Sequence, residues 1–298
     1  MKLHFRKILV YLPAGAAAGA AIENAQAVAS VDNSTITCVD VVTPMSSLWD
    51  SIIPEAERKD RLDRRIAKLE TIVTPYQQGE HQIVTKVLRG APVVALNKEI
   101  ETGDYDLVIK QGGGDPPERI FSSIDFRLAR HCPVPLLLTQ AGAETDWEDI
   151  LVAIDPEAGV FGMKLNDELI RQASAVARFH KAKLHVVSAW SKLGFMFDGK
   201  GEQITEGKYQ EYVDRGHRRV RDTVKAIVDR SLYHVDPENI TIESGISDNL
   251  ILDAVKVVKP DLLVMGGIGR GAISGLLMGN TTERVIRRAR CSIMTVKP

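Results

Sequence analysis

The sequence contains few cysteines and no excess of charge of either sign. The three cysteines, Cys38, Cys132 and Cys291, are odd in number and far apart. This argues against a disulfide framework or a zinc site and is typical of reduced, buried thiols in a cytoplasmic protein. The 38 Lys and Arg residues nearly balance the 39 Asp and Glu residues, so no overall field attracts nucleic acid or an acidic membrane. We therefore expect a cytoplasmic protein that binds neither and recognises its partners locally.

The sequence also lacks the common signatures of a catalytic centre. It has no H-E-x-x-H or H-x-x-E-H zinc pair, no C-x-x-C motif and no nucleophile beside an evident general base. The seven histidines are scattered along the chain, and we interpret them as surface or packing residues. These absences predict a protein without catalytic residues and without a metal site.

What the sequence does contain is an internal repeat. Three pairs of segments match: ILVYL from Ile8 with ILVAI from Ile150, YDLVIKQGGG (105–114) with PDLLVMGGIG (260–269), and RLARHCPVPLLLT (127–139) with IRRARCSIMTV (286–296). We therefore predict two domains, residues 1–143 and 144–298, with residues 141–149 as the linker between them.

The N-terminal segment 1–30 also resembles a secretory signal, because it has a basic start, an apolar middle and AQA at 25–27. A cleavable signal has no reason to match an internal segment of its own protein. We therefore favour a strand followed by a helix at this end of the chain.

Short apolar runs alternate with longer helical patterns in both copies. The expected strands are Ile8–Leu12, Thr35–Val42, Gln82–Leu88, Ile150–Ile154, Lys183–Ser188, Asn239–Glu243 and Asp261–Met265. This alternation predicts an α/β fold with a parallel sheet that helices cover on both faces. We interpret the charge-rich helical stretches 54–73 and 209–231 as solvated outer faces with no role in nucleic acid binding.

The stretch MGGIGRGAISGLLMGN at 265–280 contains six glycines and follows the last of these strands. We expect the next helix to have Asn280 or Thr281 as its N-cap, with Glu283 in the capping-box position. The glycines fit either a flexible connection or a loop that lets an anion such as phosphate approach the helix N-terminus. The stretch lacks the lysine of a P-loop and comes too late in its unit for a Rossmann fingerprint.

The spacing Gly266-x2-Gly269-x9-Gly279, followed by Asn280, resembles the ATP-binding motif of the universal stress protein family. With the closing segment CSIMTVKP and the doubled architecture, the chain is similar to the tandem-domain members of that family. The resemblance implies that each domain has a five-stranded parallel sheet with helices on both faces, of the HUP or adenine nucleotide alpha hydrolase-like type.

The same resemblance implies a ligand and a role. The chain would bind ATP at the carboxyl edge of the C-terminal sheet and act in the stress response as a nucleotide-dependent regulatory or binding module for an unknown protein partner. The residues implied are Asp155 for adenine, the Ala189 backbone for the base, and Gly266, Gly269, Gly279, Asn280 and Thr281 for the phosphates, with Mg²⁺ as an optional companion. Any ATP hydrolysis would be slow and incidental.

The N-terminal copy departs from this motif. Pro13 stands where the C-terminal copy has Asp155, and no glycine between Asp115 and Arg130 matches Gly279. We therefore expect no ATP in the N-terminal domain. The alternative that stays open is a non-nucleotide, lipid-like ligand there, or a structural role for the whole protein.

The apolar segments PLLLT and SIMTV close the two copies. In the family, such terminal strands pair across a dimer interface, and an unpaired apolar edge is an aggregation risk. We therefore expect one chain to form an intrachain pseudo-dimer. Whether two chains then form a homodimer stays open.

Overall fold

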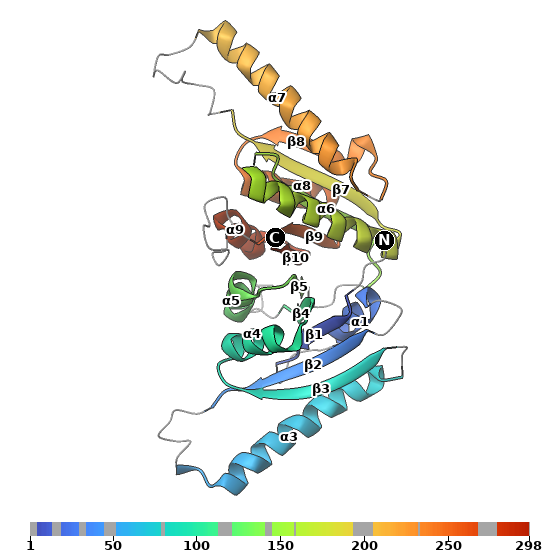
Figure 1. Cartoon of the computed structure of the whole chain (residues 1–298), viewed down its shortest axis with the longest axis vertical. Coiled ribbons are helices and arrows are strands. Elements are labelled where there is room, and N and C mark those ends of the chain that lie inside the picture. Colours follow the sequence, from blue (N-terminus) through green and yellow to red (C-terminus); the bar gives the residue numbers. More distant parts are fainter. Residues whose placement is uncertain are drawn as a thin grey trace.

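Ten strands form one continuous sheet in the order β3-β2-β1-β4-β5-β10-β9-β6-β7-β8, which extends along the long axis of the molecule (Figure 1). The computed structural model describes residues 5–13, 19–29, 34–44, 52–78, 81–112, 121–140, 145–157, 159–192, 205–231, 233–267 and 279–297. Within each half of the chain, all neighbouring strands are parallel. Each half therefore has the five-stranded parallel sheet that the sequence predicts.

The N-terminal half alternates strands with helices. Its elements are β1 (Lys7–Tyr11), α1 (Gly19–Val28), β2 (Thr35–Val42), α3 (Glu55–Val73), the 3-10 turn η1 (Thr74–Tyr76), β3 (Gln82–Arg89), α4 (Pro92–Gly103), β4 (Leu107–Gln111), α5 (Ser123–His131) and β5 (Leu136–Thr139). None of the helices in the described part of the chain is long and apolar enough to span a membrane.

The C-terminal half repeats this arrangement. Its elements are β6 (Asp149–Ile154), α6 (Gly159–His180), β7 (Lys183–Trp190), α7 (Glu206–Val228), the 3-10 turn η3 (Pro237–Asn239), β8 (Ile240–Ser244), α8 (Ser247–Val258), β9 (Leu262–Gly266), α9 (Asn280–Arg288) and β10 (Ser292–Val296). β7 continues beyond the predicted end at Ser188, because Trp190 is buried and pairs with Ser244 of β8.

Helices cover both faces of the sheet and bury two apolar layers (Figure 1). Ile8 and Val10 of β1 lie in the layer that contains α1 and α6, whereas Leu9 and Tyr11 lie in the layer that contains α4 and α5. Successive side chains of a strand point to opposite faces, so a central strand covered on both faces is apolar at every position. This explains why the central strands read as continuous apolar runs.

The three cysteines are free and buried in these layers. Burial raises the pKa of Cys38 and of Cys291 to about 12 and that of Cys132 to about 11. Because the thiolate is the reactive form of cysteine, these thiols stay protonated and unreactive at neutral pH. The prediction of buried thiols is confirmed.

The two halves meet where β5 pairs with β10 in the antiparallel sense. Beside this pairing, α5 contacts α9: the Arg130 guanidinium lies 3.2 Å from the Glu283 carboxylate, and the Arg287 guanidinium lies 4.5 Å from the centroid of the Phe126 ring. The Lys297 ammonium also donates to the carbonyl oxygen of Arg130 at 3.0 Å. The expected pairing of the two terminal strands within one chain is therefore confirmed.

The predicted linker, 141–149, is wrong at its C-terminal end. Trp147 is 1% exposed, its ring centroid lies 4.8 Å from that of His180, and β6 already begins at Asp149. Residues 141–144 lie outside the described residues. The polar composition of the segment suggested a linker, but its one aromatic side chain gains more from burial than from exposure.

Replacing Trp147 with alanine should destabilise the protein by roughly 3–5 kcal/mol, because the truncation leaves a cavity in the core. Urea unfolding followed by circular dichroism measures the change. Phe179→Ala is the matched control, since this ring also contacts His180 but the residue is 51% exposed. An equal, small loss in both variants would show that Trp147 does not anchor the start of the C-terminal half.

Candidate functional site

Three neighbouring strands of the C-terminal half end at one edge of the sheet. β6 lies between β9 and β7, with Ile154 beside Ser188 of β7 and Val152 beside Val264 of β9. Asp155 directly follows Ile154, Ala189 directly follows its partner Ser188, and Gly266 ends β9 two residues beyond Val264. The structure therefore brings Asp155, Ala189 and Gly266 together at the carboxyl edge, where open α/β sheets bind ligands.

The backbone of Asp155 is held by a side chain of α6. Asn166 accepts a hydrogen bond from the Asp155 N–H at 2.9 Å and donates one to the Asp155 carbonyl oxygen at 2.6 Å. Asn166 is 1% exposed, so both of its bonds are made inside the protein. The Asp155 carboxylate itself accepts from the N–H of Glu157 at 3.0 Å, which forms a local turn of the kind that aspartate favours.

The residue that sequence reasoning missed is Asn166. It precedes the buried Leu169 and Ile170 by three and four positions, which is the spacing of one helix face. A polar amide on the apolar face of a helix needs a buried partner, and this signal was present in the sequence.

Ala189 lies near the end of β7 and is buried. Its register partner in β8 is Glu243, so its main chain is part of the parallel ladder. Next to it, Trp190 stacks on His217 of α7, with ring centroids 5.8 Å apart. The β7 terminus is thus fixed on both sides, and His217 is a packing residue as the sequence predicts.

Gly266 packs closely against α6, so that a larger residue here would displace a side chain. A Cβ atom at this position would lie 2.9 Å from Leu165 Cδ2 of α6, which is closer than two carbon atoms can approach without displacement. The carbonyl oxygen of Gly266 accepts a hydrogen bond from Thr282 Oγ1 at 2.7 Å. The first turn of α9 is thereby tied to the end of β9.

The expected N-cap of α9 is wrong by one or two residues. Asn280 and Thr281 lie inside the helix, and Gly279 is the N-cap, without any side-chain hydrogen bond to the first turn. The cause is tertiary: the bond between Thr282 and Gly266 sets where the helix begins. The first N–H groups of α9, for which the described residues supply no side-chain cap, are a favourable place for an anion.

The expected capping box is also wrong. The Glu283 N–H donates to the carbonyl oxygen of Gly279 at 3.0 Å, while the Glu283 carboxylate accepts from Arg287 at 2.6 Å and from Arg130 at 3.2 Å. The hydrogen bond from Arg287 is the main reason that the pKa of Glu283 is lowered. Glu283 therefore joins α9 to α5 and does not cap α9.

The predicted site also includes Gly269 and, as an optional companion of ATP, Mg²⁺. Gly269 and the rest of 268–278 lie outside the described residues. Among the residues that are described, no group of three or more His, Cys, Asp or Glu side chains could hold a metal ion.

In the N-terminal half, the helix that corresponds to α9 is α5, and a carboxylate of the chain itself lies at its start. Asp125, in the first turn of α5, accepts from the Ser122 N–H at 2.6 Å in a capping box, and its other oxygen lies 2.6 Å from the Lys110 ammonium. The side chains of Lys110 and Asp125 are 4% and 0% exposed. In the repeat, Lys110 matches Met265 of β9, and Asp125 occupies the same helix position as Thr282.

Comparison with known proteins identifies the family. A model of the universal stress protein family matches residues 4–140 and again residues 147–297. The universal stress protein E homolog of Haemophilus influenzae is 25% identical over 275 residues, which cover 88% of this chain and 86% of the relative. A Pseudomonas aeruginosa protein assigned to this family has the same fold, with a TM-score of 0.76 and 23% identity over 99% of this chain and 94% of that chain.

A universal stress protein in complex with cAMP is a more distant neighbour. It is 17% identical, has a TM-score of 0.34, and matches 51% of this chain and 98% of its own. A likeness of this size assigns no ligand to the present chain. The repeated family match, together with the two parallel halves of the sheet, shows that the chain belongs to the universal stress protein family and carries two such domains in tandem.

Proposed function

We propose that the C-terminal domain binds ATP at the carboxyl edge of β9, β6 and β7, and that binding regulates the contact of this cytoplasmic protein with a partner in the stress response. The observation that carries the proposal is the start of α9. Its N-cap residue, Gly279, has no side chain with which to cap the first turn, and this turn is tied to the end of β9 by the hydrogen bond from Thr282 to Gly266. An anion at this point would meet the N–H groups of the helix start, for which no cap is found among the described residues, and the positive end of the helix dipole.

The phosphate end of the ligand would rest on this helix start. Gly279 has φ −67° and ψ 146°, an extended conformation that any residue can adopt, so its backbone does not require glycine. The absence of a side chain is instead useful because it lets a ligand approach the main chain closely. Asn280 and Thr281 lie next to it in the first turn, where their side chains can donate further hydrogen bonds. Gly269 completes the motif in the proposal.

The adenine end would lie across the termini of β6 and β7. Asp155 supplies a carboxylate that can accept a hydrogen bond from the amino group of adenine, while the main chain of Ala189 faces the base. The two bonds from Asn166 hold the Asp155 backbone in place before the ligand arrives. Such preorganisation reduces the conformational entropy that binding would otherwise cost.

Among the described residues of the proposed site, no group is placed to position a water molecule for attack on the terminal phosphate. Asp155 takes part in a turn with Glu157 and is assigned to the base, far from the terminal phosphate in the proposed orientation. We therefore propose a binding module in which hydrolysis is slow. Mg²⁺, when present, would be held mainly by phosphate oxygens, as is common for this ion.

The N-terminal domain is proposed to hold no ATP. The first turn of α5 is already neutralised by Asp125, whose carboxylate is fully buried and paired with Lys110. A phosphate would have to displace this carboxylate or lie beside it, and two anions in one buried site repel each other. Pro13 also offers no side-chain acceptor to an adenine at the end of β1.

Gly279→Glu should abolish ATP binding, because a carboxylate at the N-cap of α9 both crowds and repels the phosphates. Isothermal titration calorimetry should show about one ATP per wild-type chain and no measurable uptake by the variant. Gly207→Glu is the matched control, since a Cβ added at Gly207 meets no atom within 4 Å. Equal affinities in the wild-type protein and in Gly279→Glu would show that ATP binds elsewhere.

Asp155→Ala should weaken ATP binding about tenfold or more, since a hydrogen bond to a charged group contributes about 1.5–3 kcal/mol. Equilibrium dialysis with labelled ATP measures the change. Glu157→Ala removes a neighbouring, exposed carboxylate and should change the affinity less than twofold. If both variants lose affinity equally, general charge at this edge is responsible, and the assignment of Asp155 to adenine is wrong.

Lys110→Met should destabilise the protein by roughly 3–5 kcal/mol, because it leaves the buried Asp125 carboxylate without its cation. The double variant Lys110→Met/Asp125→Thr copies the Met265 and Thr282 pair of the C-terminal half and should recover most of this loss. Urea unfolding of the single and double variants tests the coupling. Additive losses would contradict a direct interaction between these two side chains.

A further inference from the structure

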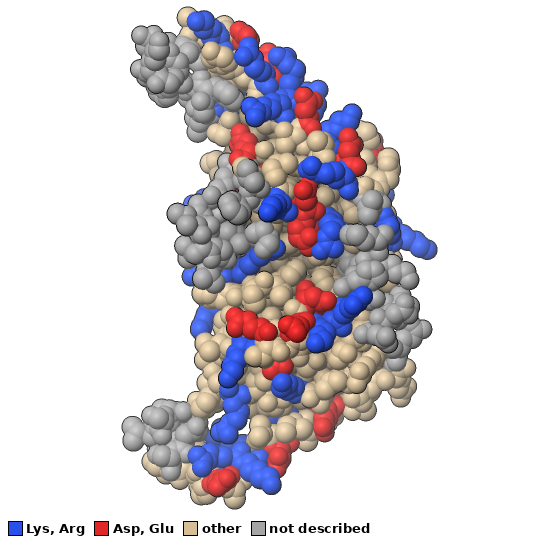
Figure 2. All heavy atoms as spheres, in the orientation of Figure 1, with Lys and Arg blue, Asp and Glu red and all other residues tan. Residues whose placement is uncertain are grey.

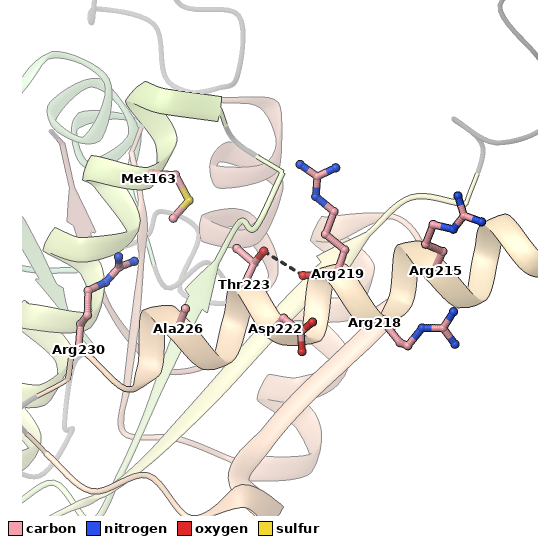
Figure 3. A pocket seen from close by; sticks show the side chains of 8 residues that line it. All are labelled: Met163, Arg215, Arg218, Arg219, Asp222, Thr223, Ala226 and Arg230. Carbon is pink, nitrogen blue, oxygen red and sulfur yellow. Dashed lines mark hydrogen bonds between the residues drawn. The ribbon is translucent and has the colours of Figure 1, made fainter.

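A hollow of about 600 Å³ lies between α6 and α7 on the outer side of the C-terminal domain. Its lining comes from one residue of α6, one face of α7 and the segment that follows: Met163, Arg215, Arg218, Arg219, Asp222, Thr223, Ala226 and Arg230. Figure 3 shows Arg215, Arg219 and Arg230 extending toward the side of α7 on which Met163 lies, whereas Arg218 extends toward the opposite side and reaches only the rim of the hollow. Four of the lining residues are thus arginines and only one is acidic.

Two of these guanidinium groups have no partner in the described structure. Arg215 pairs with Glu211 at 2.5 Å and Arg230 pairs with Asp167 at 2.9 Å. Arg218 and Arg219 have neither an ion pair nor a side-chain hydrogen bond to any described residue. Like charges placed close together repel each other, so the hollow has positive charge that an anion from solution can neutralise.

We propose that this hollow binds a small molecule that carries two or more adjacent phosphate groups. The guanidinium group is planar and always charged, and its fork of N–H donors matches phosphate oxygens two at a time. The hollow, of about 600 Å³, is shallow and widely open to solvent, so the charge of its arginines and not enclosure would hold the ligand. Thr223, at the wall of the hollow, adds a hydroxyl group, although this hydroxyl already donates to the carbonyl oxygen of Arg219.

The distribution of charge favours a compact ligand over nucleic acid. Carboxylates interrupt the basic residues of α7, at Glu211, Asp214 and Asp222, and Figure 2 shows positive and negative side chains mixed over this end of the molecule. A duplex needs a longer, uninterrupted basic surface to contact many phosphates. The four arginines that line the hollow form a short basic group, which favours an anion of a few phosphate groups over a long polyanion.

This site is separate from the proposed ATP site. Its lining residues come from α6, α7 and the segment after α7, whereas the ATP site is built on the ends of β6, β7 and β9 and on α9. The two proposals can therefore fail independently, and a variant of one site should leave the other intact.

Isothermal titration calorimetry with inorganic tripolyphosphate tests the proposal on four full-length proteins. These are the wild type, Arg218→Gln/Arg219→Gln, Arg221→Gln and Gly279→Glu. Arg221 is the matched control, because it is an exposed arginine of α7 that does not line the hollow. Exposed substitutions of this kind rarely change the stability of the fold.

We expect one binding event to weaken at least tenfold in Arg218→Gln/Arg219→Gln, to persist in Arg221→Gln and Gly279→Glu, and to weaken as salt concentration rises. Unchanged binding in Arg218→Gln/Arg219→Gln would overturn the proposal. Equal weakening in Arg221→Gln would also overturn it, because it would indicate a general attraction between charges. Tighter binding of a short DNA duplex than of tripolyphosphate at the same arginines would overturn it as well. If Gly279→Glu loses ATP binding but still binds tripolyphosphate at the hollow, the two sites are separate, as proposed.

Discussion

The alignment of parallel strands at one edge of the C-terminal sheet is the constraint on which the proposed site depends. With β6 between β9 and β7, the registers place the residues that follow β6 beside the ends of both neighbours. Asp155, Ala189 and Gly266 are therefore close to one another, although they are far apart in sequence. Asn166 fixes the Asp155 backbone, and Thr282 fixes α9 to the end of β9. Packing alone thus assembles the edge before any ligand is present.

The two halves differ in what lies at the start of their last helix, α5 or α9. Every helix begins with unpaired N–H groups that need an acceptor. In α5, the Asp125 carboxylate satisfies this need and is itself neutralised by Lys110. In α9, no cap is found for the first turn among the described residues, because its N-cap Gly279 has no side chain, and the position of Lys110 is taken by the apolar Met265. The start of α5 is thus occupied by a carboxylate of the chain itself, whereas the start of α9 is where we propose that an anion binds, while β5 and β10 join the halves into a single sheet.

Much of the fold could be predicted from the sequence, because the matching halves show the same alternation of apolar runs and helical stretches; the bounds of β2 are as predicted. The details that could not be predicted depend on tertiary contacts. Asparagine is preferred over glycine at N-caps, yet the bond from Thr282 to Gly266 makes Gly279 the N-cap. The polar stretch before β6 hides a buried Trp147. The phosphate-binding role proposed for the glycines rests on the family resemblance, since glycine count alone does not distinguish a flexible loop from a binding loop.

A crystal structure of the chain grown with a non-hydrolysable ATP analogue tests the central claim most directly. The account predicts one nucleotide in each chain, with its phosphates against the first turn of α9 and its base between Asp155 and the main chain of Ala189. A C-terminal edge filled by the protein's own side chains, or a nucleotide bound instead at the start of α5, would contradict it.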